Sequence, residues 1–302
     1  MPQYAIMSEL HANWEAFVAV YKGVLEYPKI REICILGDIV GYGPNPNELI
    51  AGLQEIEGKG FTLHLNMGGH DAAAIGSYDF VDLSDPVDME RVKLSTGLET
   101  RDQIGHAFRH KELGRFIPVK AEAKAAIEWT KEQLTPESLE FLRTRLEEKI
   151  ELRPGIVCVH GSVCDPVFEY VHDRHFAVKC YESREMDNVR LCFVGHTHQP
   201  MVWRARIEDR IGIAESKVLL SAPVASMPTE VDLDFTTYSY IINVGAVGQP
   251  RDGDPRATFV VYDSDNNTAK YIRVPYDVQR TKAKIVKRGL PKILATRLDQ
   301  ST

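Results

Sequence analysis

Six short segments rich in Gly, His and Asp recur along this chain of 302 residues, each where a short apolar run gives way to a loop. They lie at residues 8–11, 37–44, 68–71, 159–162, 195–198 and 243–254. Short apolar runs of this kind are typical of buried strands. Because the carboxyl ends of parallel strands meet at one edge of an open α/β sheet, we expect the six segments to gather there. The pattern therefore favours an α/β fold with one functional edge.

The first part of the chain alternates predicted strands with predicted helices. The strands are expected at 4–7, 33–36 and 61–65, and the helices at 13–25 and 47–56. Strands that are separated by amphipathic helices predict right-handed β-α-β units and a mostly parallel sheet.

The middle of the chain interrupts this alternation. Residues from about 72 to 115 are mixed, charged and helical only in parts, which predicts an insertion. Helices at 121–134 and after Thr135 follow, and then the pattern becomes rich in strands. These strands are expected at 156–159, 191–194, 217–220, 238–242, 258–262 and 270–274. A basic tail starts at about 276 and is interpreted as a solvated helix face. Since no long linker is present, we expect one domain over 1–302.

Composition limits the classes of function. The formal net charge of −7 does not predict a broad basic face, so duplex nucleic acid is not an expected partner. No apolar run approaches the roughly 20 residues that cross a bilayer, and no signal peptide pattern is present, so we expect a cytoplasmic protein. A phosphate site on this acidic chain would need local positive charge, which metal ions supply. The five cysteines form no Cys-x-x-Cys pair and are expected to be structural thiols.

Imidazoles and carboxylates at the predicted strand ends form a candidate metal site. The candidate ligands are Glu9, His11, Asp38, His160, His196 and His198. Glu9 and His11 are two residues apart, so both side chains can reach one ion, and His196 and His198 repeat this spacing. The Asp38 carboxylate has two oxygens that can bridge two cations. A mixed oxygen and nitrogen donor set suits manganese, iron or zinc.

Two ions roughly 3.5–4 Å apart are a recurrent device for phosphoryl chemistry. When a phosphate ester is cleaved, an alcohol leaves and needs a proton. A side chain that donates this proton would complete such a site. His70 is the candidate, with the neighbouring Asp71 carboxylate orienting its imidazole. Arg251 is a candidate for clamping a phosphate, and Tyr42 for stacking on a base, with plain solvation and loop capping as the alternatives.

In this order the segments resemble those of the calcineurin-like metallophosphoesterases, which usually read Asp-x-His, Gly-Asp, Gly-Asn-His-Asp, His-Gly and Gly-His-x-His. The sequence Gly-Asp-Ile-Val-Gly-Tyr-Gly-Pro at 37–44 resembles a small prokaryotic branch of that family. The resemblance implies an α/β fold in which two mixed β-sheets pack as a sandwich flanked by helices. It implies hydrolysis of a small phosphoester, either a diester or a monoester, with two divalent metal ions. A nucleotide is among the candidate substrates.

The resemblance also implies a role for each candidate residue. One ion would be held by Glu9, His11, Asp38 and His198. The second ion would be held by Asp38, His160 and His196, so that Asp38 bridges the two. His70 would lie near the phosphate, with Asp71 behind it.

Two positions depart from the family pattern. Glu9 stands where the family has Asp, which adds one methylene to the ligand. Gly69 stands where the family has Asn, so the second ion loses an amide oxygen. The second site is therefore expected to be the weaker one. The alternative interpretation is a weakly active or non-catalytic relative that binds one metal, a nucleotide or a partner on the same scaffold.

Overall fold

The computed structural model describes residues 3–109, 112–208 and 229–301, and its centre is a pair of β-sheets. The six-stranded sheet has the order β10 (Glu230–Asp232), β13 (Thr268–Val274), β12 (Ala257–Asp263), β1 (Gln3–Met7), β2 (Ile30–Ile35) and β3 (Thr62–Leu65). The five-stranded sheet has the order β6 (Lys149–Arg153), β7 (Ile156–Val159), β8 (Leu191–Val194), β11 (Tyr238–Asn243) and β9 (Met201–Arg206). Both sheets are mixed, because β1, β2 and β3 run parallel, as do β7, β8 and β11, whereas their outer neighbours run antiparallel.

The alternation of side chains along the central strands explains the sandwich. In β1, Tyr4 and Ile6 face the other sheet, whereas Ala5 and Met7 face the helices. In β8, Phe193 joins the core between the sheets and Cys192 faces outward. Strands that are apolar on both faces must be covered on both faces. The predicted α/β sandwich of two mixed sheets is confirmed.

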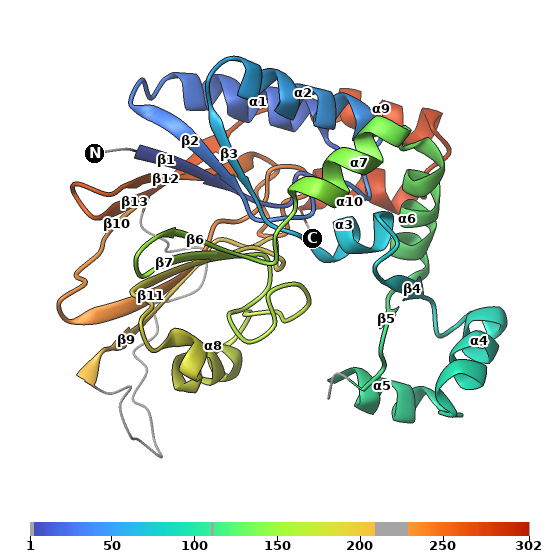
Figure 1. Ribbon diagram of the computed structural model, residues 1–302. Coiled ribbons are helices and arrows are strands. Elements are labelled where there is room, and N and C mark those ends of the chain that lie inside the picture. The colour runs from blue at the N-terminus through green and yellow to red at the C-terminus, as the bar shows by residue number, and fades with distance from the viewer. Residues whose placement is uncertain (1–2, 110–111, 209–228, 302) are drawn as a thin grey trace.

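Helices cover the outer faces of the two sheets (Figure 1). On the side of the six-stranded sheet these are α1 (Trp14–Leu25), α2 (Pro46–Gly58), α6 (Ala121–Gln133), α7 (Pro136–Arg145), α9 (Val278–Lys287) and α10 (Lys292–Gln300). Helix α8 (Arg174–Glu182) covers the five-stranded sheet. The basic tail thus folds into α9 and α10, and Leu294 and Leu298 of α10 pack against Ala126 of α6.

Capping residues fix where two predicted helices begin. The Asn13 side chain accepts a hydrogen bond from the backbone N–H of Ala16 and caps α1, and Thr135 caps α7 through the N–H of Ser138. Asn13 also donates to the carbonyl oxygen of Gly248 at 2.8 Å. It therefore ties the start of α1 to the segment that follows β11.

The segment after β3 leaves the sandwich. It begins with α3 (Gly69–Ala74) and continues through β4 (Asp79–Val81), α4 (Pro86–Thr96), α5 (Arg101–Arg109) and β5 (Phe116–Pro118). Figure 1 shows α4 and α5 set apart from the two sheets, and they share a small apolar cluster of their own. The strand predicted at 217–220 lies outside the described residues.

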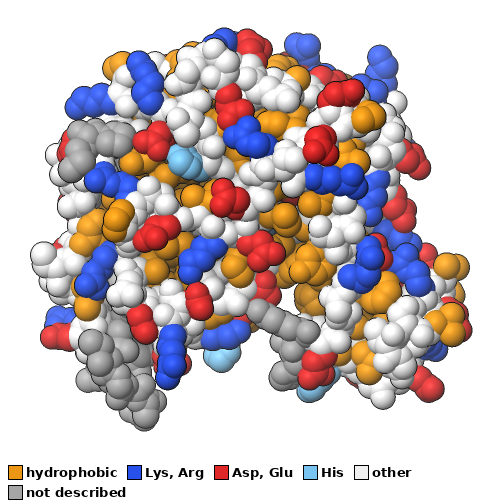
Figure 2. All heavy atoms as spheres, viewed as in Figure 1, with side chains coloured by type: hydrophobic (Ala, Val, Ile, Leu, Met, Phe, Trp, Pro, Cys, Tyr) orange, Lys and Arg blue, Asp and Glu red, His pale blue; other side chains and the backbone are white. Residues whose placement is uncertain are grey.

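The surface and the helices give two further observations. On the face in Figure 2, acidic and basic side chains are interspersed rather than gathered into one basic patch. Among the described residues, none of the helices combines the length and apolar character needed to cross a membrane.

Candidate metal centre

The candidate ligands follow the ends of four strands, two in each sheet. Glu9 and His11 come after β1, and Asp38 comes after β2. From the other sheet, His160 follows β7, and the pair His196 and His198 follows β8. The parallel strands of both sheets end at the same edge, and all six side chains meet there in two groups. Glu9, His11 and His198 form the first group, and His160 and His196 form the second group together with Asp38. His11 and Asp38 also lie close to His70.

The backbone at this edge takes conformations that are unusual for residues other than glycine. Among the described residues, positive φ angles occur at nine such positions, and seven of them belong to the loops of this site. These seven are Glu9, His11, Ala12, Asp38, Tyr42, His196 and His198. Each such conformation costs free energy, and sites of this kind persist only where the surrounding structure holds them. The strain is thus concentrated on the candidate ligands.

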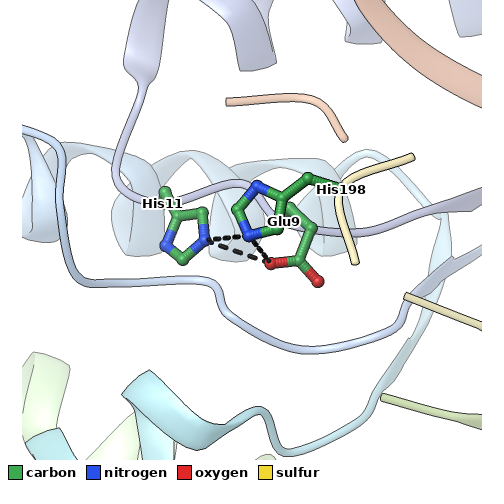
Figure 3. A group of neighbouring side chains, drawn as sticks. All are labelled: Glu9, His11 and His198. Atoms are coloured by element: carbon green, nitrogen blue, oxygen red, sulfur yellow. Dashed lines mark hydrogen bonds and ion pairs between the residues drawn. The ribbon is translucent and has the colours of Figure 1, made fainter. Parts of the chain in front are cut away.

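The first group consists of Glu9, His11 and His198, whose ligand atoms converge on one point (Figure 3). Glu9 Oε2 lies 3.1 Å from His11 Nε2 and 3.0 Å from His198 Nε2, and the two nitrogens are 3.4 Å apart. An ion about 2.0–2.2 Å from each of three ligands would set them about 3.0–3.5 Å from one another. The spacing therefore fits a bound cation.

Hydrogen bonds to the backbone decide which ring nitrogen faces this point. His11 donates from Nδ1 to the carbonyl of Val40 at 3.3 Å, and His198 donates from Nδ1 to the carbonyl of Gln249 at 2.6 Å. Since a carbonyl oxygen only accepts, the proton lies on Nδ1 and the lone pair on Nε2. Burial lowers the pKa of His11, and it lowers the pKa of His198 to about 3. Both rings are thus neutral at pH 7 and have no proton to share with each other.

The two imidazoles of the second group, His160 and His196, are also bonded to backbone carbonyls. In His196, however, Nε2 is the bonded nitrogen and Nδ1 faces inward. His160 donates from Nδ1 to the carbonyl of Leu36 at 2.7 Å, and His196 donates from Nε2 to the carbonyl of Phe168 at 3.2 Å. His160 Nε2 and His196 Nδ1 then face each other at 2.9 Å. Burial lowers the pKa of both rings. Two lone pairs at this distance repel unless a cation lies between them.

Asp38 lies between the two groups. Its Oδ2 is 3.6 Å from His11 Nε2 and 3.7 Å from His160 Nε2, while its Oδ1 accepts a hydrogen bond from the backbone N–H of His70. Burial, and then the nearby Glu9 carboxylate, raises the pKa of Asp38. A cation at this place would offset that effect and keep the carboxylate charged. Asp38 thus lies near one imidazole of each group.

Both carboxylate oxygens of Glu9, whose side chain is one methylene longer than that of Asp, have close polar neighbours. While Oε2 faces His11 and His198, Oε1 accepts hydrogen bonds from the Ser8 hydroxyl at 2.9 Å and from the backbone N–H of His196 at 2.6 Å. The extra methylene is thus accommodated by a carboxylate fixed between the two groups.

Asp71 does not orient the His70 ring, contrary to the expectation from sequence. The Asp71 oxygens accept the backbone N–H groups of Ile39, Val40 and Gly68 at 3.0–3.2 Å. Within the part of the chain that the structure describes, His70 Nδ1 has no hydrogen-bond partner. Both residues lie on α3, where side chains of consecutive residues point in different directions. Asp71 therefore fixes the loop that carries Asp38. The His70 ring is positioned instead by contacts with neighbouring aromatic rings.

The His70 ring lies beside the first group and is held by packing. Its centroid is 5.0 Å from that of His11, 4.3 Å from that of Tyr42 and 5.1 Å from that of Phe80. The left-handed residue Gly41 lies so close that a Cβ there would be 2.4 Å from His70 Nδ1. Burial, and then the neighbouring His11 ring, lowers the pKa of His70 well below its ordinary value.

Sequence reasoning missed two aromatic residues of this site. A Cβ at Gly69 would meet the ring of Phe168 at 3.2 Å, so Phe168 occupies the space beside that glycine. The Tyr170 ring stacks on that of His196 at a centroid distance of 3.7 Å. Both lie in the loop between β7 and α8, about 100 residues from Gly69, and no local pattern connects them.

A cavity of about 870 Å³ opens onto the centre. Asp38, His70, His196 and His198 form part of its wall, together with the predicted substrate residues Tyr42 and Arg251. The guanidinium of Arg251 lies over the Tyr42 ring and donates to Gln249 Oε1 at 2.9 Å. The cavity continues to Arg101 and Phe108 of α5 and to the residues that follow β5.

Comparisons with known proteins bear on the family of the chain. A sequence model described as calcineurin-like phosphoesterase matches residues 3–200. The chain is 27% identical over 298 residues to an uncharacterized protein of Methanocaldococcus jannaschii, covering 97% of this chain and 96% of that protein.

Two solved structures have the same fold over the whole chain. The crystal structure of a metallophosphoesterase from Sphaerobacter thermophilus aligns with a TM-score of 0.69 at 29% identity, covering 100% of this chain and 99% of that one. A hypothetical protein from Pyrococcus horikoshii aligns with a TM-score of 0.69 at 19% identity and the same coverage. The chain belongs to the calcineurin-like phosphoesterase family.

Proposed function

We propose that this protein hydrolyses a small phosphoester with two divalent cations. Glu9, His11, Asp38 and His198 would hold one cation, and Asp38, His160 and His196 would hold the other. The observation that carries the proposal is the convergence of neutral imidazole lone pairs on the two carboxylates, with their N–H groups bonded to backbone carbonyls. When bound, such cations offset the charge of the phosphate and lower the pKa of the attacking water.

We propose His70 as the group that passes a proton to the leaving alcohol. It lines the cavity, and it lies close enough to His11 and Asp38 to form a group with them. In the free protein its lowered pKa keeps the ring neutral. A phosphate beside the ring would favour the protonated form, because an opposite charge at short range raises the pKa of an imidazole. Asp71 would act only by holding the Asp38 loop.

The shape of the cavity supports a substrate the size of a nucleotide. Leu83, Phe108 and Val119 supply an apolar part of the wall, and Arg101 and Lys120 supply exposed positive charge beside it. Apolar walls with a few convergent charges are typical of small-molecule sites. Arg251 and Tyr42 would then contact the phosphate end of the substrate.

The competing proposal is a relative that binds one metal and has little activity. The crowding at Gly69 favours it, because a Cβ there would lie 3.2 Å from the Phe168 ring, and the ring therefore restricts a longer side chain that could supply a ligand from residue 69. The missing ligand at residue 69 would weaken only the cation held by Asp38, His160 and His196. The two proposals therefore differ in metal content as well as in rate.

Metal analysis and a hydrolysis assay on a bis-aryl phosphate with added Mn²⁺ test the proposal. His11→Asn should lose bound metal and activity together. His64→Asn is the matched control, because His64 lies in β3 and pairs with Glu32 away from the site. Two bound ions with turnover support the proposal. One bound ion with negligible turnover supports the competing proposal, and a fully metal-free protein that still turns over contradicts both.

A further inference from the structure

A second cluster of reactive side chains lies outside the metal centre, where the loop after β7 meets α8. Cys164 comes from the loop and Cys180 from the helix, and their sulfurs lie within 4.8 Å of each other and of a Glu169 oxygen. Neither cysteine is in a disulfide. Cys180 is buried and Cys164 is only partly buried, so one thiol of the pair can be reached from solvent.

The surroundings of the pair do not favour a metal ion. Glu169 Oε1 is bound by the ammonium of Lys179, and Glu169 Oε2 accepts the Ser162 hydroxyl at 2.5 Å. The carboxylate is thus already used, and a positive charge already lies beside the sulfurs. These features favour the chemistry of two neighbouring thiols instead.

The turn that carries Cys164 is well defined. The Ser162 hydroxyl oxygen accepts the backbone N–H groups of Cys164 and Asp165, both at 3.0 Å. A Cβ at Gly161 would lie 2.6 Å from the Asp165 carbonyl oxygen, so the backbone is tightly folded here. The turn therefore presents the Cys164 sulfur to α8 in one orientation.

The two thiols differ in acidity. The hydrogen bond from the Cys180 thiol is the largest cause that lowers the pKa of Cys164 to about 6, followed by a hydrogen bond from Ser183 and the Lys179 charge, while burial and the Glu169 carboxylate act in the opposite direction. The same hydrogen bond, followed by burial, raises the pKa of Cys180. Exposed thiolates are the cysteines that oxidants attack first.

We propose that Cys164 and Cys180 are an oxidisable pair, in which a hydroperoxide oxidises Cys164 and Cys180 then closes a disulfide between the loop and α8. The Cys164 thiolate attacks the peroxide, the O–O bond breaks, and the departing oxygen leaves as an alcohol, or as water from hydrogen peroxide, after taking up a proton. Cys180 then attacks the resulting sulfenic acid, the S–O bond breaks, and water leaves with the proton of Cys180. Two electrons pass from the sulfurs to the peroxide.

The location gives this pair a route to the metal centre. The segment from Cys164 continues to Phe168, whose carbonyl accepts the hydrogen bond of His196, and to Tyr170, which stacks on that ring. A disulfide fixes its sulfurs about 2.05 Å apart, so closing it would tie the turn to α8. Oxidation is therefore expected to constrain the backbone that orients His196.

Peptide mapping of the intact protein under non-reducing conditions tests the pair. After treatment with hydrogen peroxide we expect a Cys164–Cys180 disulfide. The internal control is Cys34 and Cys158, which share the apolar core between the sheets and are 0% exposed, so they should stay reduced. In Cys180→Ala, dimedone should trap a sulfenic acid on Cys164, and in Cys164→Ala neither product should form.

The pH dependence of alkylation separates a reactive pair from an ordinary exposed thiol. In the wild-type protein the iodoacetamide rate at Cys164 should be half-maximal near pH 6, and in Cys180→Ala at a clearly higher pH, because the largest cause of the lowered pKa, the hydrogen bond from Cys180, is lost. A folded protein whose Cys164 and Cys180 remain reduced under peroxide, or that binds one zinc ion through Cys164, would overturn the proposal. Neither readout depends on phosphoesterase activity.

Discussion

At the scale of single residues, the centre is organised by backbone carbonyls as much as by the ligands themselves. Val40, Leu36, Phe168 and Gln249 each accept one imidazole N–H, and so each selects the nitrogen that faces the site. His196 differs from the other three because its Nε2 is the bonded atom and Nδ1 faces inward. Such partners fix both the tautomer and the direction of a ligand.

The contact between Gly69 and Phe168 leads to a prediction about the weaker metal site. Gly69→Asn alone should change little, because its Cβ would lie 3.2 Å from the Phe168 ring. Gly69→Asn combined with Phe168→Ala should tighten binding of the second cation, since the ring no longer fills the space. Calorimetric titration with Mn²⁺ measures both affinities. Phe168→Ala alone is the control, and equal affinities in the double variant and this control would refute the idea.

Removal of His70 should have an effect that depends on the leaving group. His70→Ala should slow hydrolysis of an alkyl phosphoester roughly 10²–10⁴-fold, the usual contribution of general acid catalysis, and should slow an activated aryl ester far less. Metal content should not change, since the ring is not placed among the ligands. The ratio of kcat values for the two esters is the measurement. Equal losses for both esters would remove His70 from this role.

At the scale of elements, the loops at the strand ends carry the ligands and the long segment after α3 carries the far wall of the cavity. Helix α3 connects the two, because Gly69 and His70 line the cavity at its start while Asp71 anchors the Asp38 loop. Helices α4 and α5 have an apolar cluster of their own. Substitutions in this wall should therefore leave the packing of the two sheets unchanged.

The position of α5 predicts a role in substrate binding. Arg101→Gln should raise the KM of a nucleotide about five-fold with little change in kcat, which corresponds to the loss of about 1 kcal/mol from one exposed charge contact. Lys131→Gln on α6 is the control, because Lys131 is exposed and lies outside the cavity wall. The KM of a bis-aryl phosphate that reaches only the metal centre should stay unchanged. A uniform fall in kcat for all substrates would contradict this role.

At the scale of the whole molecule, the site joins the two sheets. Glu9 comes from the six-stranded sheet and His198 from the five-stranded sheet, and they are 3.0 Å apart at their closest atoms. Cations bound there would link both halves of the sandwich. Without them, neutral lone pairs face one another in a buried place, which weakens the native state.

Metal removal should therefore lower the thermal stability of the protein. At a metal concentration 100 times the dissociation constant, one site contributes about 2.7 kcal/mol, which corresponds to about 4 °C in Tm for a chain of this length. Calorimetry before and after treatment with a chelator, and after addition of Mn²⁺, measures the shift. His64→Asn should show the full shift and His11→Asn only part of it. An unchanged Tm on metal removal would contradict the placement of the ligands.

Much of the fold follows from patterns within single segments. The apolar run of β1 and the capping residue Asn13 were sufficient to predict a strand, a loop and a helix in that order, because strand and helix periodicity act over a few residues. The separation of Asp71 from the His70 ring was not predicted, because it depends on which backbone N–H groups the folded Asp38 loop presents to α3.

Local apolar periodicity and residue type are enough to predict the α/β class, the ends of the central strands and the residues that stand there. They do not predict which of these residues meet, which ring nitrogen faces inward, or that Phe168 lies against Gly69. These features depend on how two sheets pack face to face. Packing brings together atoms from segments about 100 or more residues apart. The distances between such atoms cannot be predicted from the residue pattern within one segment.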